Sequence, residues 1–142
     1  MSSRAAGSKG GTISIKDINS GKLFLIDSGA DVSVFPLTLS PSSSASTGSL
    51  VAANGTKIKT FGFKMVELLF GSLSLSHRFQ VADISKPILG SDFFAQHDLM
   101  IDVKNRRLVR PAGRGSAHDF VLSAVPADSG VIAGLKSVNF RR

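Results

Sequence analysis

The segment LFLIDSGADVSVFP, residues 23–36, decides the fold of this chain. Its apolar residues 23–26 predict a buried β-strand that ends directly at Asp27. Ser28 and Gly29 follow as a tight turn, because glycine adopts backbone angles that other residues rarely reach. Taken alone, Asp-Ser-Gly is also a common turn in which the Asp side chain bonds its own backbone. With these apolar flanks, the segment predicts a strand that delivers a carboxylate to the rim of the fold.

Two further segments accompany this block. Residues 50–58, LVAANGTKI, are typical of a β-hairpin, since Asn54 and Gly55 suit a two-residue type I′ turn. Residues 87–94, PILGSDFF, combine an apolar run, a glycine and the start of a helix. Together the three segments resemble the active-site loop, the flap and the closing strand and helix of retroviral-type aspartic proteases, the retropepsins. The resemblance covers residues 12–110 and is greatest to the proteases of long-terminal-repeat retrotransposons.

The resemblance implies an all-β fold, a small closed antiparallel β domain with one short C-terminal helix and an active site on the twofold axis of a homodimer. The hydrophobic pattern agrees with it, because alternating apolar and polar residues favour strands with one buried face. The strands that we expect lie at residues 12–15, 22–26, 57–66, 67–70, 73–76, 79–82, 99–103 and 107–109. Residues 91–97 predict a short helix with Ser91 as a possible N-cap.

Length and composition favour one domain. The chain has 142 residues, of which 42% are hydrophobic, enough for a single modest core. We expect a flexible N-terminal extension at residues 1–11, a retropepsin-like domain at 12–110 and a basic extension of low order at 111–142. The sequence holds no Cys, which excludes disulfides and thiolate nucleophiles. Without an apolar span or signal-like centre, it predicts an intracellular protein, cytoplasmic or within virus-like particles.

Most of the net charge of +7 lies near the C-terminus. Residues 1–103 hold 9 Lys and Arg against 8 Asp and Glu, whereas residues 104–142 hold 8 against 2. A basic tail could contact nucleic acid phosphates, but only Phe120 and Phe140 are present there to stack on bases. We therefore expect a solvated extension, with nucleic acid binding as a lesser possibility and no membrane partner.

Peptide hydrolysis by carboxylates needs two of them, one to accept a proton from water and one to donate a proton to the scissile carbonyl. A second Asp-Ser-Gly stands at residues 128–130, but only 12 residues follow it and Val125-Pro126-Ala127 before it is no buried strand. We therefore predict that the second carboxylate is Asp27 of another copy, placed by a twofold axis.

The resemblance assigns roles around this carboxylate. Asp27 is similar to the catalytic aspartate, and Ser28 to the residue whose hydroxyl bonds across the dimer. Gly29 is similar to the glycine whose carbonyl meets the substrate backbone, with Ala30 beside it. Asp31 resembles the second acid of the loop, which accepts from substrate, although stabilising the local turn is an equally good interpretation.

Further candidate substrate-binding residues follow from the same resemblance. Leu25, Val34 and Ile88 fall where the family lines its side-chain pockets, and core packing explains them at least as well. The residues at the expected flap tip are Ala53, Asn54 and Gly55. Lentiviral members carry an arginine directly after the glycine of the closing segment, where this chain has Ser91. Asp31 would then need other donors, such as Ser91 or backbone N–H groups.

The other polar residues suggest no metal or cofactor. His77, His97 and His118 are far apart in sequence, with no Glu or Cys at ligand spacing. Ser28 lacks the Gly-x-Ser-x-Gly context of a serine nucleophile. The acids that we interpret as surface or capping residues are Asp83, Asp92, Asp98 and Asp102.

Together these features predict a homodimeric aspartic endopeptidase that cleaves polypeptides, such as the polyprotein of a retroelement or a related host target. A ubiquitin-shuttle-type protease domain is an alternative, although such domains typically carry an amide where this chain has Asp31. Another is a non-catalytic, domesticated retropepsin fold that binds peptide or RNA. An all-β nucleotide pyrophosphatase fits less well, since the sequence holds no Tyr and no Gly-rich phosphate motif.

Overall fold

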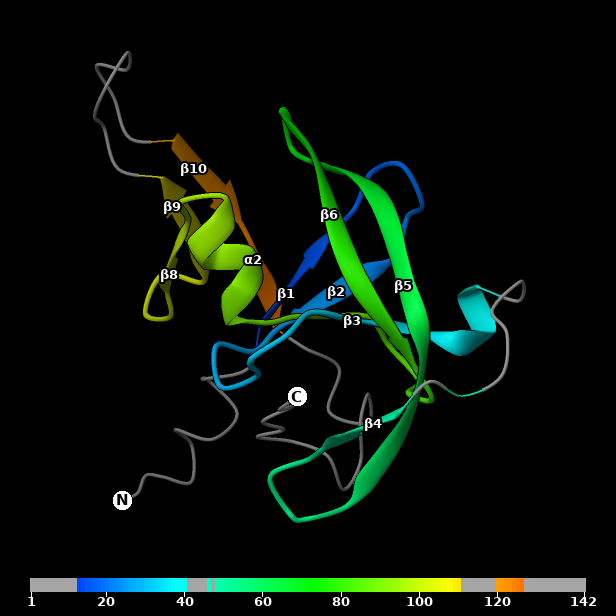
Figure 1. Cartoon of the computed structure of the whole chain (residues 1–142). Helices are drawn as coiled ribbons and strands as arrows, with labels where there is room; N and C mark the ends of the chain where they lie inside the picture. The colour runs from blue at the N-terminus through cyan, green and yellow to red at the C-terminus, as the bar shows by residue number, and fades with distance from the viewer. Residues whose placement is uncertain (1–12, 41–45, 47, 111–119, 127–142) are drawn as a thin grey trace.

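The computed structural model of the chain describes residues 13–40, 46, 48–110 and 120–126. Within them, strands dominate, joined by one short α-helix and one turn of 3-10 helix (Figure 1). The elements are β1 (Ile13–Lys16), β2 (Leu23–Ile26), β3 (Val34–Pro36), η1 (Leu37–Leu39), β4 (Gly48–Val51), β5 (Lys57–Phe70), β6 (Leu73–Ala82), β7 (Ile88–Leu89), α2 (Ser91–Gln96), β8 (Met100–Asp102), β9 (Arg107–Arg110), β10 (Phe120–Ser123) and β11 (Val125–Pro126). The prediction of a mostly β fold with one short helix is confirmed.

The strands form an eight-stranded sheet in the order β11-β1-β2-β7-β3-β6-β5-β4 and a three-stranded sheet in the order β10-β9-β8. Most neighbours are antiparallel, but β2 pairs with β7 and β3 pairs with β6 in parallel. The expected antiparallel domain therefore contains parallel pairs at the centre of the sheet. Parallel neighbours need a long connection, and the excursion through β3 to β6 provides it for β2 and β7.

The long β5–β6 hairpin organises one side of the molecule (Figure 1). Its tight end lies at Gly71, which has a φ of 60°. Register shifts between Thr60 and Phe63, where Gly62 has a φ of 90°. Such a bulge bends the strand, so β5 pairs with β4 before it and with the main length of β6 after it.

The β4–β5 turn differs from the predicted type I′ turn. That turn requires positive φ at both central residues, but among residues 52–56 only Gly55 has one, 87°. The N–H of Gly55 donates to the carbonyl of Ala52 at 2.9 Å, and the N–H of Thr56 donates to the Asn54 side-chain oxygen, also at 2.9 Å. Asn54 therefore stabilises a wider turn through its side chain, while the glycine alone takes the left-handed conformation.

Two apolar clusters fill the interior, and β2 separates them because its side chains alternate between faces. Phe24 and Ile26 enter the larger cluster, while Leu25 enters the smaller one. The Phe24 ring lies 5.8 to 6.4 Å, centroid to centroid, from three other phenylalanine rings. Those rings belong to Phe35, Phe70 and Phe79.

The described strands continue beyond Arg110, where we expected the domain to end. β10 pairs with β9, and β11 pairs with β1 through Ile13 and Pro126. Residues 120–126 therefore belong to the sheets, so a low-order extension over the whole of 111–142 is wrong for them. Residues 1–12, 111–119 and 127–142, with His118 and the second Asp-Ser-Gly, lie outside the described residues. In the described part of the chain, no helix has the length and apolar character to cross a membrane.

We expect Phe24→Ala to lower the free energy of unfolding by about 3 to 5 kcal/mol, because it removes a ring that is 1% exposed. Chemical denaturation followed by circular dichroism measures the change. Phe63→Ala is the matched control, the same substitution at a ring that is 52% exposed and packs under Arg78. It should cost about 1 kcal/mol or less, and equal losses at the two positions would contradict the packing described.

Candidate active site

The acid loop, which we define as residues 27–33, begins where β2 ends. The N–H of Asp27 donates to the carbonyl of Leu89 at 2.9 Å, which continues the pairing of β2 with β7. The N–H of Ala30 donates to the carbonyl of Asp27 at 3.1 Å, and the N–H of Gly29 donates to Asp27 Oδ1 at 3.0 Å. A buried strand thus carries a carboxylate onto a tight turn, which is the local geometry that the sequence predicts.

Backbone groups at the start of α2 hold the acid loop from behind. The N–H of Ser91 donates to the carbonyl of Ala30 at 2.7 Å, and the N–H of Gly90 donates to Ser33 Oγ at 2.9 Å. A Cβ at position 90 would lie 2.5 Å from the carbonyl oxygen of Val32 and 2.8 Å from that of Ala30. The helix N-cap is therefore Gly90, and the prediction that Ser91 caps the helix is wrong.

The electrostatic environment of Asp27 favours its protonated form. Burial raises the pKa of this carboxyl group above 3.8, and the backbone N–H groups of Gly29 and Ala30 oppose the rise only in part. A carboxyl group whose pKa is raised can hold a proton close to the pH at which it must donate one. The site thus supplies an acid of the kind that a shared-proton pair needs.

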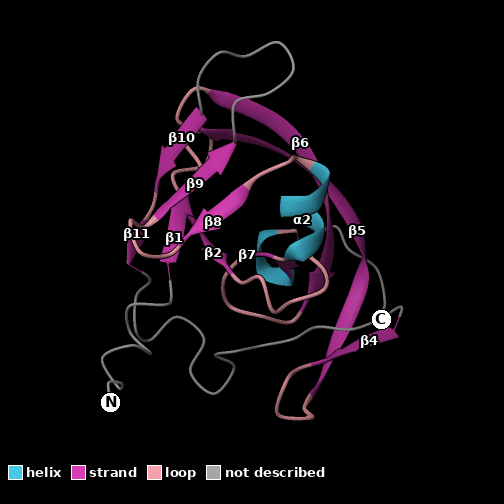
Figure 2. Cartoon of the chain, turned by 90° about the vertical axis from the view of Figure 1, so that its left-hand side faces the viewer, coloured by secondary structure: helices cyan, strands magenta, loops and turns pink. Residues whose placement is uncertain are grey.

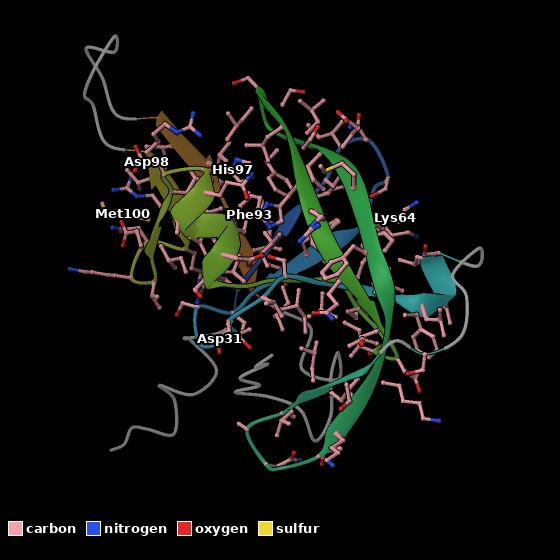
Figure 3. All side chains as sticks on the ribbon, in the orientation of Figure 1. Asp31, Lys64, Phe93, His97, Asp98 and Met100 are labelled. Atoms are coloured by element: carbon pink, nitrogen blue, oxygen red, sulfur yellow. The ribbon has the colours of Figure 1, made fainter. Side chains whose placement is uncertain are left out.

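The tip of the acid loop is open to solvent. Ser28, Gly29 and Asp31 are exposed, and Figure 3 shows Asp31 on the loop below α2. The backbone donor of Ser91, one of those expected for Asp31, is used instead by the Ala30 carbonyl. Asp31 is therefore placed where a further chain could contact it, and its role toward substrate stays a prediction.

The expected pocket residues lie directly beneath the acid loop. Leu25 is 5% exposed, while Ala30, Val34 and Ile88 are fully buried in the smaller apolar cluster. Three residues of the β4–β5 hairpin, Leu50, Ala52 and Ile58, belong to the same cluster. In the single chain these side chains support the loop by packing, so contact with a substrate side chain requires the hairpin to move.

The hairpin tip, in contrast, is free of the core. Ala53, Asn54 and Gly55 are exposed at the end of the β4–β5 hairpin, which Figure 1 shows extending away from the body. The β4–β5 hairpin therefore shares an apolar cluster with the acid loop, and its role as a flap stays a prediction.

One polar network near the site was missed in the sequence. Asp92 Oδ1 accepts from the Ser33 hydroxyl at 2.7 Å, and Asp92 Oδ2 lies 3.0 Å from His77 Nε2. The other ring nitrogen of His77 lies 3.1 Å from His97 Nε2. The interpretation of Asp92 as a surface or capping acid is therefore wrong, because two buried donors hold it.

A usable signal for this network was present but weak. His77 shares the alternation of β6 with Phe79 and Val81, which predicts an inward side chain. Its partners Asp92 and His97 lie in α2 and at its C-terminal end. The sequence does not show that this helix packs against β6, because β7 stands between them in the chain. Among the described residues, no group of three or more His, Asp or Glu side chains has the geometry to hold a metal ion.

A small cavity of about 160 Å³ opens beside this network. It contacts the C-terminal end of the acid loop, whereas Asp27 begins that loop. Ser33, His77, Arg78 and Asp92 contribute to its lining, and Asp27 does not. Gln80 Oε1, which is buried at this cavity, has no hydrogen-bond partner within the described part of the chain. Because the cavity lacks the candidate catalytic carboxyl, we do not assign substrate binding to it.

Comparison with known proteins identifies the fold. No protein-family model matches the sequence, and no curated protein matches it. A solved structure, the retroviral protease-like domain of Ddi1 from Leishmania major, is similar with a TM-score of 0.58 and 16% identity, over 83% of this chain and 95% of that one. EIAV protease in complex with the inhibitor HBY-793 matches with a TM-score of 0.45 and 23% identity, over 61% of this chain and 86% of that one. The chain has a retropepsin-like fold.

We expect Gly90→Ala to lower the free energy of unfolding by about 1 to 3 kcal/mol, since the new methyl group would overlap two backbone carbonyls of the acid loop. Gly48→Ala is the control, because a Cβ there meets only Thr60 Oγ1 at an ordinary 3.5 Å. Denaturant titration of both variants measures the difference. A Gly90→Ala variant as stable as the control would contradict the close approach.

We expect Asp27→Asn to stabilise the chain more at neutral than at acid pH. Because its folded pKa is raised from 3.8, Asp27 holds more protons in the folded chain than in the unfolded chain between those two values. Wild-type stability therefore falls as pH rises through this interval, and the amide variant escapes that loss. Calorimetry should show nearly equal Tm values at about pH 3 and a higher Tm for the variant at about pH 7.

The exposed acid Asp98 provides the control for this measurement, since Asp98→Asn makes the same change of charge outside the site. Asn also tolerates the positive φ of 58° at that position. A Tm difference for Asp27→Asn that stays constant with pH would argue against a raised pKa.

Proposed function

We propose that this chain is an aspartic endopeptidase that acts as a homodimer, with one Asp27 from each copy. The observation that carries the proposal is the half-buried Asp27 carboxyl, held by Gly29 on a turn at the end of β2 in a retropepsin-like fold. Its raised pKa supports the same reading. The fold alone would not suffice, because one fold hosts many functions.

The proposed chemistry uses two carboxyl groups that share one proton. The ionised Asp27 accepts a proton from water as the water oxygen attacks the scissile carbonyl carbon. The protonated Asp27 of the other copy donates its proton to the carbonyl oxygen, which gives a neutral tetrahedral intermediate. Collapse breaks the C–N bond: the Asp27 that took the water proton gives it to the leaving amine, and the other, now ionised Asp27 takes a proton from a hydroxyl of the intermediate. Each copy supplies one acid loop, so neither copy completes the pair alone.

The proposed substrate is an extended polypeptide that lies between the acid loop and the β4–β5 hairpin. In this proposal Gly29, Ala30 and Asp31 meet its backbone on one side, and residues 53–55 meet it on the other. A strand-like peptide suits this arrangement, because main-chain hydrogen bonds bind it and alternate side chains enter pockets. In this proposal Leu25, Val34 and Ile88 line those pockets once the β4–β5 hairpin moves away from the smaller apolar cluster. A retroelement polyprotein is the substrate class that we favour.

Cleavage of a peptide library by wild-type and Asp27→Asn chains tests the proposed activity. We expect the amide variant to lose roughly 1,000-fold or more of kcat/KM, because an amide can neither accept the water proton nor share one. Asp98→Asn serves as the control and should keep its activity. Cleavage retained in a well-folded Asp27→Asn chain would refute the proposal. Absence of cleavage by wild type at every concentration would favour a peptide-binding module.

Mixing the two chains tests whether the site is shared between copies. If each active site needs two Asp27 residues, an equal amount of Asp27→Asn added to wild type converts wild-type dimers into mixed ones. Activity should then fall to about half of its starting value once the copies exchange. Added Asp98→Asn should raise activity instead. No change on adding the Asp27→Asn chain would indicate a site complete within one copy.

A further inference from the structure

A partly buried chain of hydrogen bonds connects α2, β6 and the acid loop. It runs from His97 to His77, from His77 to Asp92 and from Asp92 to Ser33, with separations of 3.1, 3.0 and 2.7 Å. Gly90 completes it by donating its N–H to Ser33 Oγ at 2.9 Å. His77 and Ser33 are 2% and 1% exposed, so water competes little for these bonds. Figure 3 shows His97 and Phe93 on the side of α2 that faces β6.

The direction of every bond in this chain follows from Asp92. Burial alone would raise the pKa of Asp92, but hydrogen bonds from His77 and Ser33 lower it below its usual range. The carboxylate therefore only accepts, which makes His77 Nε2 and Ser33 Oγ donors. In the tautomer with its proton on Nε2, His77 accepts at Nδ1 from His97 Nε2–H, and Ser33 Oγ accepts from the Gly90 N–H. Each donor in the chain thus has one acceptor. Asp92 accepts at both ends, from His77 at one oxygen and from Ser33 at the other.

Packing fixes the histidines in this arrangement. The His77 ring makes edge contacts with Phe79 and Phe93 at centroid distances of 5.3 and 5.1 Å. His97 ends α2, and its carbonyl accepts from Arg110 Nη2 at 2.6 Å. Burial and the neighbouring His77 and Arg110 charges lower the pKa of His97, which favours the neutral ring as a donor. Asp92 is thus held at a fixed position relative to β6.

Asp92 connects His77 of β6 to Ser33 of the acid loop through its two carboxylate oxygens. The loop also bonds β7 and α2 through Asp27 N–H to Leu89 and through Ser91 N–H to Ala30, but both of those bonds join backbone groups that any sequence offers. The Ser33 link depends on side chains. Ser33 ends the acid loop that begins with Asp27, so this link restrains the loop at the end opposite the carboxyl group.

We propose that Asp92 and His77 are positioning residues that hold the acid loop, and with it the Asp27 carboxyl, in register for the pairing of two copies. The inference rests on the proposed peptidase function for its consequence in catalysis. Its structural content, that the His77 to Asp92 to Ser33 chain restrains the acid loop, is independent of that function. A displacement of about 1 Å at a catalytic group can cost about 100-fold in rate. Losing a restraint on the acid loop should therefore lower the rate measurably.

The first experiment measures the restraint without reference to activity. Amide hydrogen exchange of Gly29 and Ala30 is compared in the full chain and in its Asp92→Ala variant by NMR. We expect about tenfold faster exchange of these loop amides in the variant, because Ser33 and His77 lose their common acceptor. Asp102→Ala is the matched control, since it also removes a carboxylate paired with side-chain donors, in the β8–β9 hairpin.

The conservative variant Asp92→Asn separates geometry from charge. Its amide oxygen can accept from Ser33, and its amide N–H can donate to His77 Nε2 if His77 carries its proton on Nδ1 and donates to His97. The hydrogen-bond chain is then restored in the reverse direction. Loop exchange should return to within about twofold of wild type in this variant. Ser33→Ala, which leaves the His77 to Asp92 bond intact, should behave like Asp92→Ala if the latter folds poorly.

The second experiment measures kcat and KM for the same variants on a cleaved peptide. Asp92→Ala and Ser33→Ala should lose about 10- to 100-fold in kcat with smaller changes in KM, while Asp92→Asn and Asp102→Ala stay near wild type. Unchanged loop exchange in both Asp92→Ala and Ser33→Ala would overturn the proposal, as would unchanged kcat in both. If wild type cleaves nothing while loop exchange responds as expected, the peptidase function fails and the positioning of the loop stands.

Discussion

The backbone contact between Gly90 and the acid loop is the constraint on which the rest of the site depends. A Cβ at position 90 would lie 2.5 Å from the carbonyl oxygen of Val32 and would overlap it. The loop and the start of α2 can therefore lie this close only because residue 90 is glycine. This approach lets Ser91 and Gly90 place their N–H groups on Ala30 and Ser33. The orientation of the Asp27 turn is thus set mainly by backbone, and side chains refine it.

The same contact also explains why polar groups are tolerated in the interior. α2 begins next to the acid loop and lies beside β6 (Figure 2), where Asp92 and His97 are both within hydrogen-bond distance of His77. Buried polar groups are costly unless each has a partner, and here His77 meets both of them. A loop held by backbone contacts could move slightly; a satisfied network behind it removes that freedom. Apolar packing and polar satisfaction therefore act on the same few residues.

Much of the fold could be predicted from the sequence because the decisive signals are local. The apolar run before Asp27, the glycines at 71 and 90, and the alternation along β5 and β6 each fix one element. The parallel pairing of β2 with β7 could not be read in this way, since it depends on where a later strand enters the sheet. The Asp92 network was missed for the same reason, as its hydrogen-bonded partners lie up to 59 residues apart. The wide turn at Gly55 depends on the Asn54 side chain, which dipeptide preferences do not describe.

The pairing of β1 with β11 links folding to the far end of the described chain. Ile13 and Pro126 are partners although 126 − 13 = 113 residues separate them in sequence. Contacts of such long range close late, because a large loop must be ordered before they form. During synthesis β1 therefore waits, with one edge unpaired, until β10 and β11 have left the ribosome. A chain that ends before residue 120 would keep the acid loop, but β1 and β9 would each have an edge without its partner strand. Unpaired strand edges bind other chains, so such a chain should aggregate.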